Sequence, residues 1–430
     1  MRSVLGVLLA AGVLIQAPGR VVVLDHARLI DGAGGPPVAD ARIVVEGDRI
    51  TAAGPIAAVP APPGAGHVDL TGRTVLPGLI DAHFHIENRP ADPKLALHQL
   101  ANGITAFRDP GQWDEYFDGL RATMRQDGLE GPRIHTAGPH IDGPGPTPYP
   151  NDSVIARDAE EARQFAERGI AQGATAIKIY FRLPLGSAQA VIDICRARGV
   201  ISTAHLEGLD AGVLFEYGLD GVEHITSLGP SLLPQEARER YRQAVLASNA
   251  ARAEGRYAVF AALDLDGRDA HALWGVIGRR RPFIDPTLAV FERRPGISND
   301  KAKPQVVATR AAGFQNMLRA TRRAFEAGAR IVVGGHTSVP FAARGEAPWR
   351  EIELLVEAGL TPMQALQAAT ANGAAFLGRS RDLGTIEPGK LADLVVLTGD
   401  PLARIAEIRT VERVLAGGAW VDVKRYRGGK

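Results

Sequence analysis

A long central stretch in which short apolar runs alternate with longer amphipathic runs constrains the fold more than any other feature. Strand-like and helix-like runs follow one another there at residues 174–180, 187–198, 200–205, 209–217 and 221–225. The helical run 187–198 ends at Gly199, a residue typical of helix ends. Repeated βα units predict a parallel sheet with both faces covered. Their number between residues 76 and 381 favours a closed (β/α)8 TIM barrel over an open sheet.

The two flanks of this stretch share a different pattern, with short β-runs and many turn residues. The predicted strands are 21–24, 42–45, 49–52, 394–397, 411–415 and 420–423. Residues 46–49 predict a hairpin turn. We therefore predict an α/β protein in which residues 20–75 and 382–430 together form a small β-sandwich domain beside the barrel of residues 76–381.

The first 17 residues have the pattern of a secretory signal peptide. Arg2 precedes an apolar run over residues 4–15, and Ala17 is a small residue at its end. The run is too short to span a membrane comfortably. Pro18 argues against cleavage at this point, and a buried first strand or helix is the alternative. We expect export to the periplasm or the medium, with no membrane association after signal removal; a cytoplasmic location is the alternative.

Charge and cysteine content exclude several classes of function. The net charge is +1, from 49 basic and 48 acidic residues, and no long run of like charge indicates a nucleic-acid partner. Cys195 is the one cysteine, which excludes an intrachain disulfide and a cysteine-based zinc site. Its apolar surroundings predict a buried helix position. We expect a small-molecule substrate, and a homo-oligomer stays open.

His83 and His85 stand at the end of an apolar, strand-like run. Side chains at positions i and i+2 of a strand point to the same side, so both imidazoles face one point, as two ligands of one metal must. A barrel keeps its active site at the carboxyl ends of its strands. Chance and core packing are the alternative explanation for this pair.

Three further strand ends carry groups of the same chemistry. Lys178 lies inside the apolar run 176–180, with Tyr180, a candidate catalytic residue, on the same face. An ammonium there costs desolvation energy unless it is neutralised, modified or paired, or unless the strand is an edge with Lys178 in water. His205 and His224 end the next two predicted strands. Because strand ends converge at one barrel mouth, we expect these side chains to meet.

Together these segments resemble the amidohydrolase superfamily, in its imidazolonepropionase and prolidase-like branch. The resemblance covers nearly the whole chain after the N-terminal segment. It lies in LPGLIDAHFH (76–85), GITAFRD (103–109), IKIY (177–180), AH (204–205), GVEH (221–224), AGLTP (358–362) and GTIEPGKLADLV (384–395).

This resemblance implies a metal-dependent hydrolase with two divalent ions. His83 and His85 would hold one ion, and His205 and His224 the other. Lys178, carboxylated by CO₂, would bridge them, which answers its buried charge. Zinc suits imidazole and oxygen ligands, although ligand type alone does not fix the metal. Water activated by the ions would attack a polarised carbonyl.

One position departs from the pattern that the resemblance implies. An aspartate is expected at the end of the eighth strand, to bind metal and move a proton, but His336 follows the run 330–335 there. His336 itself acts as ligand or base, or another group such as Asp109 relays the proton, or the chain has lost hydrolysis.

The sequence therefore supports several functions on one scaffold. The first is cleavage of an amide bond in a dipeptide, an N-acyl amino acid or a cyclic amide. The alternatives are a lactonase or esterase on the same centre, and a non-catalytic metal- or ligand-binding protein. Arg293 and Arg294 are candidates to receive a substrate carboxylate; a solvated pair on a loop is the other interpretation.

Overall fold

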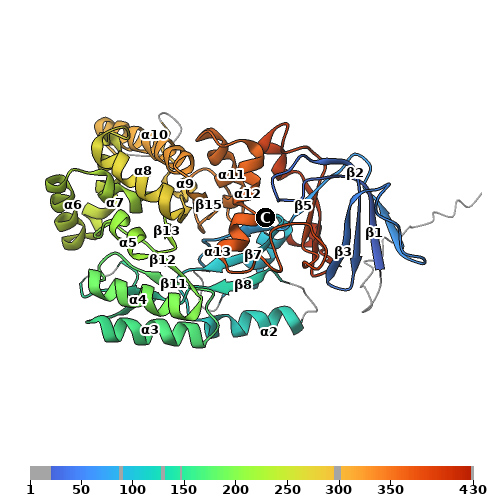
Figure 1. The fold of residues 1–430 in the computed structure, drawn as a ribbon, viewed down its shortest axis with the longest axis horizontal. Helices are drawn as coiled ribbons and strands as arrows, with labels where there is room; N and C mark the ends of the chain where they lie inside the picture. The colour runs from blue at the N-terminus through green and yellow to red at the C-terminus, as the bar shows by residue number, and fades with distance from the viewer. Residues whose placement is uncertain (1–20, 87–90, 127–130, 146–147, 295–301, 428–430) are drawn as a thin grey trace, which may run out of the picture.

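The computed structural model describes residues 21–86, 91–126, 131–145, 148–294 and 302–427. The predicted signal segment, residues 1–17, lies outside the described residues. The fold is mixed α/β, with parallel strands surrounded by helices and a mainly antiparallel sheet at one end of the molecule (Figure 1).

Both flanks of the chain build one eight-stranded sheet, as the sequence predicts for a shared domain. Its strands are β1 (Val21–Leu29), β2 (Val38–Glu46), β3 (Arg49–Pro55), β4 (Gly66–Asp69), β5 (Thr74–Pro77), β16 (Leu394–Leu397), β17 (Val411–Ala416) and β18 (Ala419–Trp420). The flanks meet where β5 and β16 pair antiparallel, with Val75 opposite Val396. The described strands of the two flanks form one sheet, so the predicted sandwich, which needs two sheets, stays a prediction. The predicted strand 420–423 is wrong beyond Trp420. The strand β18 ends at this residue, and the short helix α14 (Val423–Arg427) begins at Val423.

The central strands run parallel in two sheets. One sheet has the order β6 (Leu79–Asp81), β7 (Ile104–Asp109), β8 (Arg133–Thr136). The other has the order β10 (Ser153–Ile155), β9 (His140–Asp142), β11 (Ala176–Ile179), β12 (Ile201–Ala204), β13 (Gly221–Glu223), β14 (Phe283–Asp285), β15 (Arg330–Ile331). All pairings in both sheets are parallel. The predicted parallel arrangement is therefore confirmed.

Backbone hydrogen bonds connect both edges of the sheet β6–β7–β8 to the other parallel sheet. The amide of Thr175 donates to the carbonyl of Thr136 at 3.0 Å, which links the β8 side to β11. The amide of Ala82 donates to the carbonyl of Val333 at 2.8 Å, which links the β6 side to β15. The strands are assigned to two sheets, and closure into a barrel stays a prediction that these bonds support.

Helices follow the strands and lie outside them (Figure 1). The longer ones are α1 (Pro93–Ala101), α2 (Asp118–Gln126), α3 (Ala159–Ala171), α4 (Leu185–Arg198), α6 (Gln235–Ala247), α7 (Asn249–Ala262), α8 (Arg268–Arg280), α10 (Pro304–Glu326) and α11 (Ala347–Glu357). The shorter ones are α5 (Ala211–Tyr217), α9 (Leu288–Phe291), α12 (Pro362–Ala368) and α13 (Ala371–Phe376). As predicted, α4 buries Cys195 and ends at Gly199, whose φ of 65° suits glycine.

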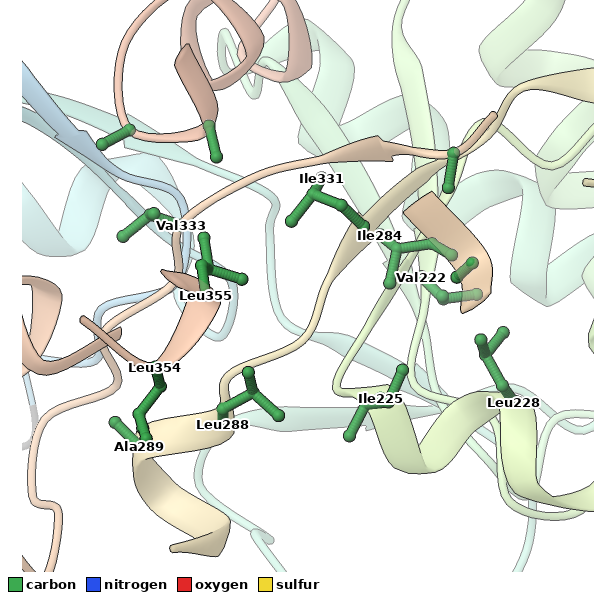
Figure 2. Close-up of a cluster of buried hydrophobic side chains, with 14 of the residues drawn as sticks. Val222, Ile225, Leu228, Ile284, Leu288, Ala289, Ile331, Val333, Leu354 and Leu355 are labelled. Atoms are coloured by element: carbon green, nitrogen blue, oxygen red, sulfur yellow. The ribbon is translucent and has the colours of Figure 1, made fainter. Parts of the chain in front are cut away.

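Apolar side chains fill the space between strands and helices. Figure 2 shows Val222, Ile284 and Ile331 from adjacent strands packed toward Leu288 and other apolar residues of α9 and α11. This packing fixes the carboxyl ends of β13, β14 and β15 relative to one another. Among the described residues no helix combines the length and apolarity needed to cross a membrane.

Candidate metal centre

The predicted imidazoles and the lysine meet at the carboxyl ends of the parallel strands. They are His83 and His85 after β6, Lys178 on β11, His205 after β12, His224 after β13 and His336 after β15. All but His83 line one cavity of about 510 Å³, and the ring of His83 lies directly behind it. The side chains expected to converge from separate strands therefore do lie together.

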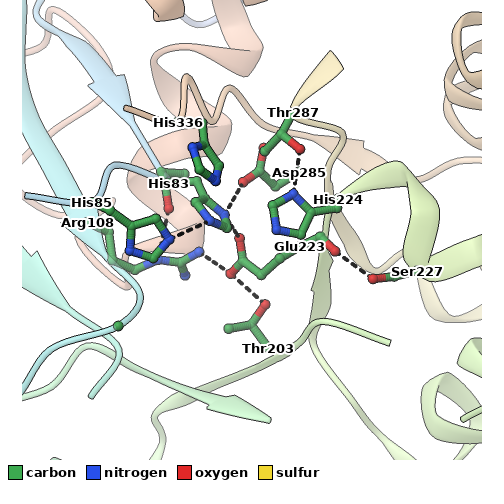
Figure 3. Close-up of polar contacts among 12 residues, drawn as sticks. His83, His85, Arg108, Thr203, Glu223, His224, Ser227, Asp285, Thr287 and His336 are labelled. Carbon is green, nitrogen blue, oxygen red and sulfur yellow. Dashed lines mark hydrogen bonds and ion pairs between the residues drawn. The ribbon is translucent and has the colours of Figure 1, made fainter. Parts of the chain in front are cut away.

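The histidine rings lie within direct contact of one another (Figure 3). The Nε2 atoms of His83 and His85 are 3.2 Å apart. The ring centre of His224 lies 4.6 Å from that of His83 and 4.5 Å from that of His205. The ring of His336 stacks 5.4 Å above that of His83. Burial, followed by repulsion from Lys178 and from neighbouring histidines, disfavours a proton on His83, His224 and His336. The pKa values of these three rings therefore lie well below 6.5, so the rings are neutral and can ligate.

Carboxylates orient the two histidines of the His-Phe-His motif. Nδ1 of His83 lies 2.7 Å from Oε2 of Glu223, and Nδ1 of His85 lies 3.5 Å from Oδ1 of Asp109. Each contact occupies Nδ1 and leaves Nε2 directed at the partner ring. This arrangement, in which a carboxylate holds the far nitrogen, is typical of metal-ligating histidines.

The other two predicted ligands are oriented in the same manner. Nδ1 of His224 lies 2.6 Å from the hydroxyl oxygen of Thr287. Nε2 of His205 lies 3.4 Å from Oε1 of the buried Glu207. Burial lowers the pKa of His205 to about 4, even though Glu207 acts in the opposite direction. One nitrogen of each ring therefore stays available to a cation.

A fully buried charged cluster under the histidines was not identified from the sequence. Glu223 contacts Arg108, accepts a hydrogen bond from the Thr203 hydroxyl at 2.8 Å, and supports His83 (Figure 3). Asp285 ends β14, and its Oδ2 lies 3.2 Å from Nδ1 of His83. Burial first, and then the charge of Glu223, raises the pKa of Asp285 well above its ordinary value. A charged residue closing a strand-like apolar run was the signal available for Asp285.

Lys178 is buried, so the alternative of a solvated edge lysine is wrong. β11 pairs with β9 on one side and β12 on the other, and Lys178 is 1% exposed. Burial lowers the pKa of its amine to about 8, and the nearby Glu223 opposes that effect. A neutral amine is therefore accessible near neutral pH.

His336 occupies a strained loop that is tied to the segment after β6. Its φ is 61°, and its amide donates to the carbonyl of His83 at 2.7 Å. Its Nδ1 accepts a hydrogen bond from the amide of Thr337 at 3.0 Å. Asp285 lies beside this loop, because a Cβ on Gly334 would meet its Oδ2 at 2.2 Å. An acidic group is thus near in space, although the neighbouring sequence has none.

Tyr180 and Asp109, the other predicted catalytic residues, also line the cavity. The Tyr180 ring stacks on that of His140 at 4.4 Å, and burial raises the pKa of its phenol. Asp109 is buried and accepts hydrogen bonds from the amides of Ile86 and Gly111, each at 2.9 Å. These contacts hold Asp109 beside His85. His140 also lines the cavity.

The donor set suits divalent cations. His83, His85 and His336 present nitrogen atoms within 4.8 Å of one another, and His83, Glu223 and Asp285 form a second such group. Both carboxylate oxygens of Asp285 are buried without a hydrogen-bond partner among the described residues. Neutral imidazoles and nearby carboxylates are the ligand chemistry of zinc and related ions.

Comparisons with known proteins agree with this geometry. The profile of the Amidohydrolase family matches residues 293–421. Ochratoxinase of Aspergillus niger is 23% identical over 92% of this chain and 86% of its own length. Imidazolonepropionase of Cutibacterium acnes is 32% identical over 25% of this chain, but the match spans only 27% of that protein. The crystal structure of a Xaa-Pro dipeptidase with bound methionine in the active site superposes with a TM-score of 0.71 and 22% identity, over 93% of this chain and 99% of that one.

Proposed function

Because the chain belongs to the amidohydrolase superfamily and is a metal-dependent hydrolase of carbon–nitrogen bonds, we propose that it cleaves an amide bond of a small molecule at a binuclear metal centre. The substrate class is a dipeptide, an N-acyl amino acid or a cyclic amide. The observation that carries the proposal is the meeting of neutral imidazoles and Lys178 from separate strands at one cavity. The backbone hydrogen bonds that join both edges of the sheet β6–β7–β8 to the other parallel sheet support a closed barrel as the scaffold.

In this proposal His83 and His85 hold one ion, and His205 and His224 hold the other. Lys178, as a carbamate, would be a ligand that the two ions share, and zinc is the proposed metal. When bound, the ions supply Lewis-acid chemistry that polarises a carbonyl and makes water more acidic. The lowered pKa of Lys178, about 8, supports carboxylation, because its neutral amine can attack CO₂ and then lose a proton.

Residues of the cavity wall position the substrate and handle protons. Asp109 holds His85 in place, and Tyr180 with His140 forms one flat wall of the cavity. His336 faces the cavity from the end of β15. While its Nδ1 accepts a hydrogen bond from the amide of Thr337, the neutral ring carries its hydrogen on Nε2, which is then a donor toward the cavity. Ligation or proton uptake at Nε2 requires the other tautomer and the loss of that contact.

A second candidate function follows from the tautomer of His336. Asp285 does not line the cavity, so it does not replace the expected aspartate as a proton shuttle for substrate. If His336 cannot take up a proton, the protein is a non-catalytic metal- or ligand-binding member of the superfamily. The ¹⁵N chemical shifts of His336 with and without metal identify its tautomer and test both roles.

The decisive experiment combines metal analysis with a substrate panel. We expect elemental analysis to find two divalent ions per chain and the panel of dipeptides, N-acyl amino acids, cyclic amides and lactones to show amide hydrolysis. Turnover of lactones alone would favour the lactonase alternative. A metal-replete protein that hydrolyses none of them, but gains activity on His336→Asp, would favour the non-catalytic alternative.

We also propose export, from the apolar run near the N-terminus. Cell fractionation of the full-length chain, with N-terminal sequencing of the recovered protein, tests it. Recovery of an intact N-terminus in the cytoplasm would contradict export.

A further inference from the structure

Two arginines of α7 form the wall of the cavity on the side of His205. Arg252 and Arg256 are one helical turn apart, so they share a helix face, and both line the cavity. Arg252 is only 6% exposed, and its Nε is buried without a hydrogen-bond partner among the described residues. A buried guanidinium with an unused donor at a cavity wall points to a ligand that accepts hydrogen bonds.

The charges around this wall do not balance. Glu207 lies 3.4 Å from Arg252 and 3.9 Å from Arg256, and Asp142 lies 3.8 Å from the buried Arg182. Three guanidinium groups thus face two carboxylates. Burial raises the pKa of Asp142 to about 6, which weakens the negative side further. Within these contacts the guanidinium groups outnumber the carboxylates by one, so a bound anion would be stabilised beside them.

This cationic wall lies within one small molecule of the metal centre. Glu207 bridges them, since one of its oxygens lies 3.4 Å from Nε2 of His205 and the other 3.4 Å from Nη1 of Arg252. A residue of extended peptide spans about 3.5 Å. Because one carboxylate contacts both groups, a small substrate can reach from the histidines to the arginines.

The arginines considered from sequence are already paired elsewhere. Arg294 binds Glu292 at 2.6 Å and Glu357 at 2.6 Å, and Arg293 donates to the carbonyl of Glu292 at 2.7 Å. Neither lines the cavity. The guanidinium of Arg293 lies 5.3 Å from the ring centre of Tyr257. These residues are therefore a poor choice for a substrate carboxylate, and Arg293 serves as a matched control.

We propose that Arg252 and Arg256 form an anion subsite that binds a substrate carboxylate, so that the proposed hydrolase acts on N-acyl amino acids or dipeptides with a free carboxylate. This inference rests on the proposed function for the amide bond, but the anion subsite itself does not. Guanidinium groups bind carboxylates through paired, charge-assisted hydrogen bonds. The subsite thus selects acidic amides over neutral ones.

The test compares N-acetyl-L-phenylalanine with N-acetylphenethylamine, which differ only by the carboxylate. We expect the wild-type protein to prefer the acid. Arg256→Met should lower kcat/KM for the acid on the order of tenfold or more and leave the neutral amide nearly unchanged. Arg256→Lys should retain part of the preference, and Arg293→Met all of it. Equal effects of Arg256→Met on both compounds would overturn the proposal.

Calorimetric binding to the metal-loaded protein separates this inference from the proposed function. Phenylacetate should bind the wild type and Arg293→Met alike and bind Arg256→Met on the order of tenfold more weakly. If no amide is hydrolysed but this difference holds, the subsite stands and the hydrolase proposal fails. Equal binding to all three proteins would overturn the subsite. Tighter, Arg256-dependent binding of inorganic phosphate would overturn the carboxylate assignment. Equal melting temperatures of the variants exclude misfolding as the cause.

Discussion

Replacing Glu223 by glutamine removes one negative charge from beneath the metal centre and changes little else in shape. The carboxylate is fully buried and contacts Arg108, Nδ1 of His83 at 2.7 Å and the Thr203 hydroxyl at 2.8 Å. Burial alone raises the pKa of Glu223, but Arg108 and Lys178 outweigh it, and the pKa lies below its ordinary value. The group is therefore ionised at neutral pH.

Two magnitudes follow from these contacts. Breaking a buried ion pair by removing one partner costs about 3–5 kcal/mol, against a total stability of roughly 5–15 kcal/mol. Loss of the carboxylate behind a ligating histidine lowers metal affinity about 10–100-fold. Asp285 moderates both effects, because its raised pKa falls once Glu223 is neutral, and its ionised form then supports His83 at 3.2 Å. We therefore expect values near the low end of each range, and a larger loss when Asp285→Asn is added.

Denaturant unfolding of the metal-free protein and competitive chelator titration of the loaded protein measure the two effects. Glu351→Gln is the matched control. Its carboxylate is equally buried and accepts hydrogen bonds from the amides of Leu288 and Ala289, but burial raises its pKa to about 8, so it is mostly neutral at pH 7. The control should lose less than Glu223→Gln does, because it leaves one backbone amide without an acceptor but removes no buried charge. Equal stability and equal metal affinity of both variants would refute the reasoning.

Other consequences are tested by metal analysis and unfolding. Lys178→Ala should remove a metal, with partial rescue by short carboxylic acids, and unchanged stoichiometry would count against bridging. His83→Ala should abolish metal binding and turnover; survival of both would place the first metal elsewhere. The pKa of His205 falls from 6.5 to about 4 through burial, so between these values the unfolded chain binds a proton that the folded chain excludes. In the metal-free protein His205 alone should therefore contribute about 3 kcal/mol of stability above pH 6.5 that is lost as the pH falls to 4. Urea unfolding with chelator present should show a weaker pH dependence for His205→Asn than for the wild type, and identical profiles would contradict this.

The sequence predicted which imidazoles meet at one cavity, because local patterns report strand ends. His83 and His85 obey the two-residue period of a strand, and Gly199 marks a helix end that the structure reproduces. The two β-rich flanks were enough to predict a shared unit, which the pairing of β5 with β16 builds. These features depend on periodicity, which a single chain displays.

Contacts between distant strands do not leave such a local signal. Glu223 and His224 are neighbours in sequence, and strict alternation would send them to opposite faces. The φ of 64° at His224 breaks the alternation, so both side chains reach the site. Arg108 and Asp285 join Glu223 from strands more than fifty residues away, and only the three-dimensional arrangement reveals that one carboxylate serves both a histidine and an arginine.

The carboxylates behind the histidines bear on the substitution at position 336. The aspartate that the resemblance implies would bring negative charge directly to the cations, and His336 does not. Instead, Glu223 stands behind His83, Asp109 behind His85 and Glu207 behind His205. Negative charge at one remove strengthens imidazole ligands. A centre built in this way depends for metal binding on its supporting carboxylates more than on residue 336. His336→Ala should therefore lower metal affinity less than Glu223→Gln does. The reverse order would make His336 a principal ligand.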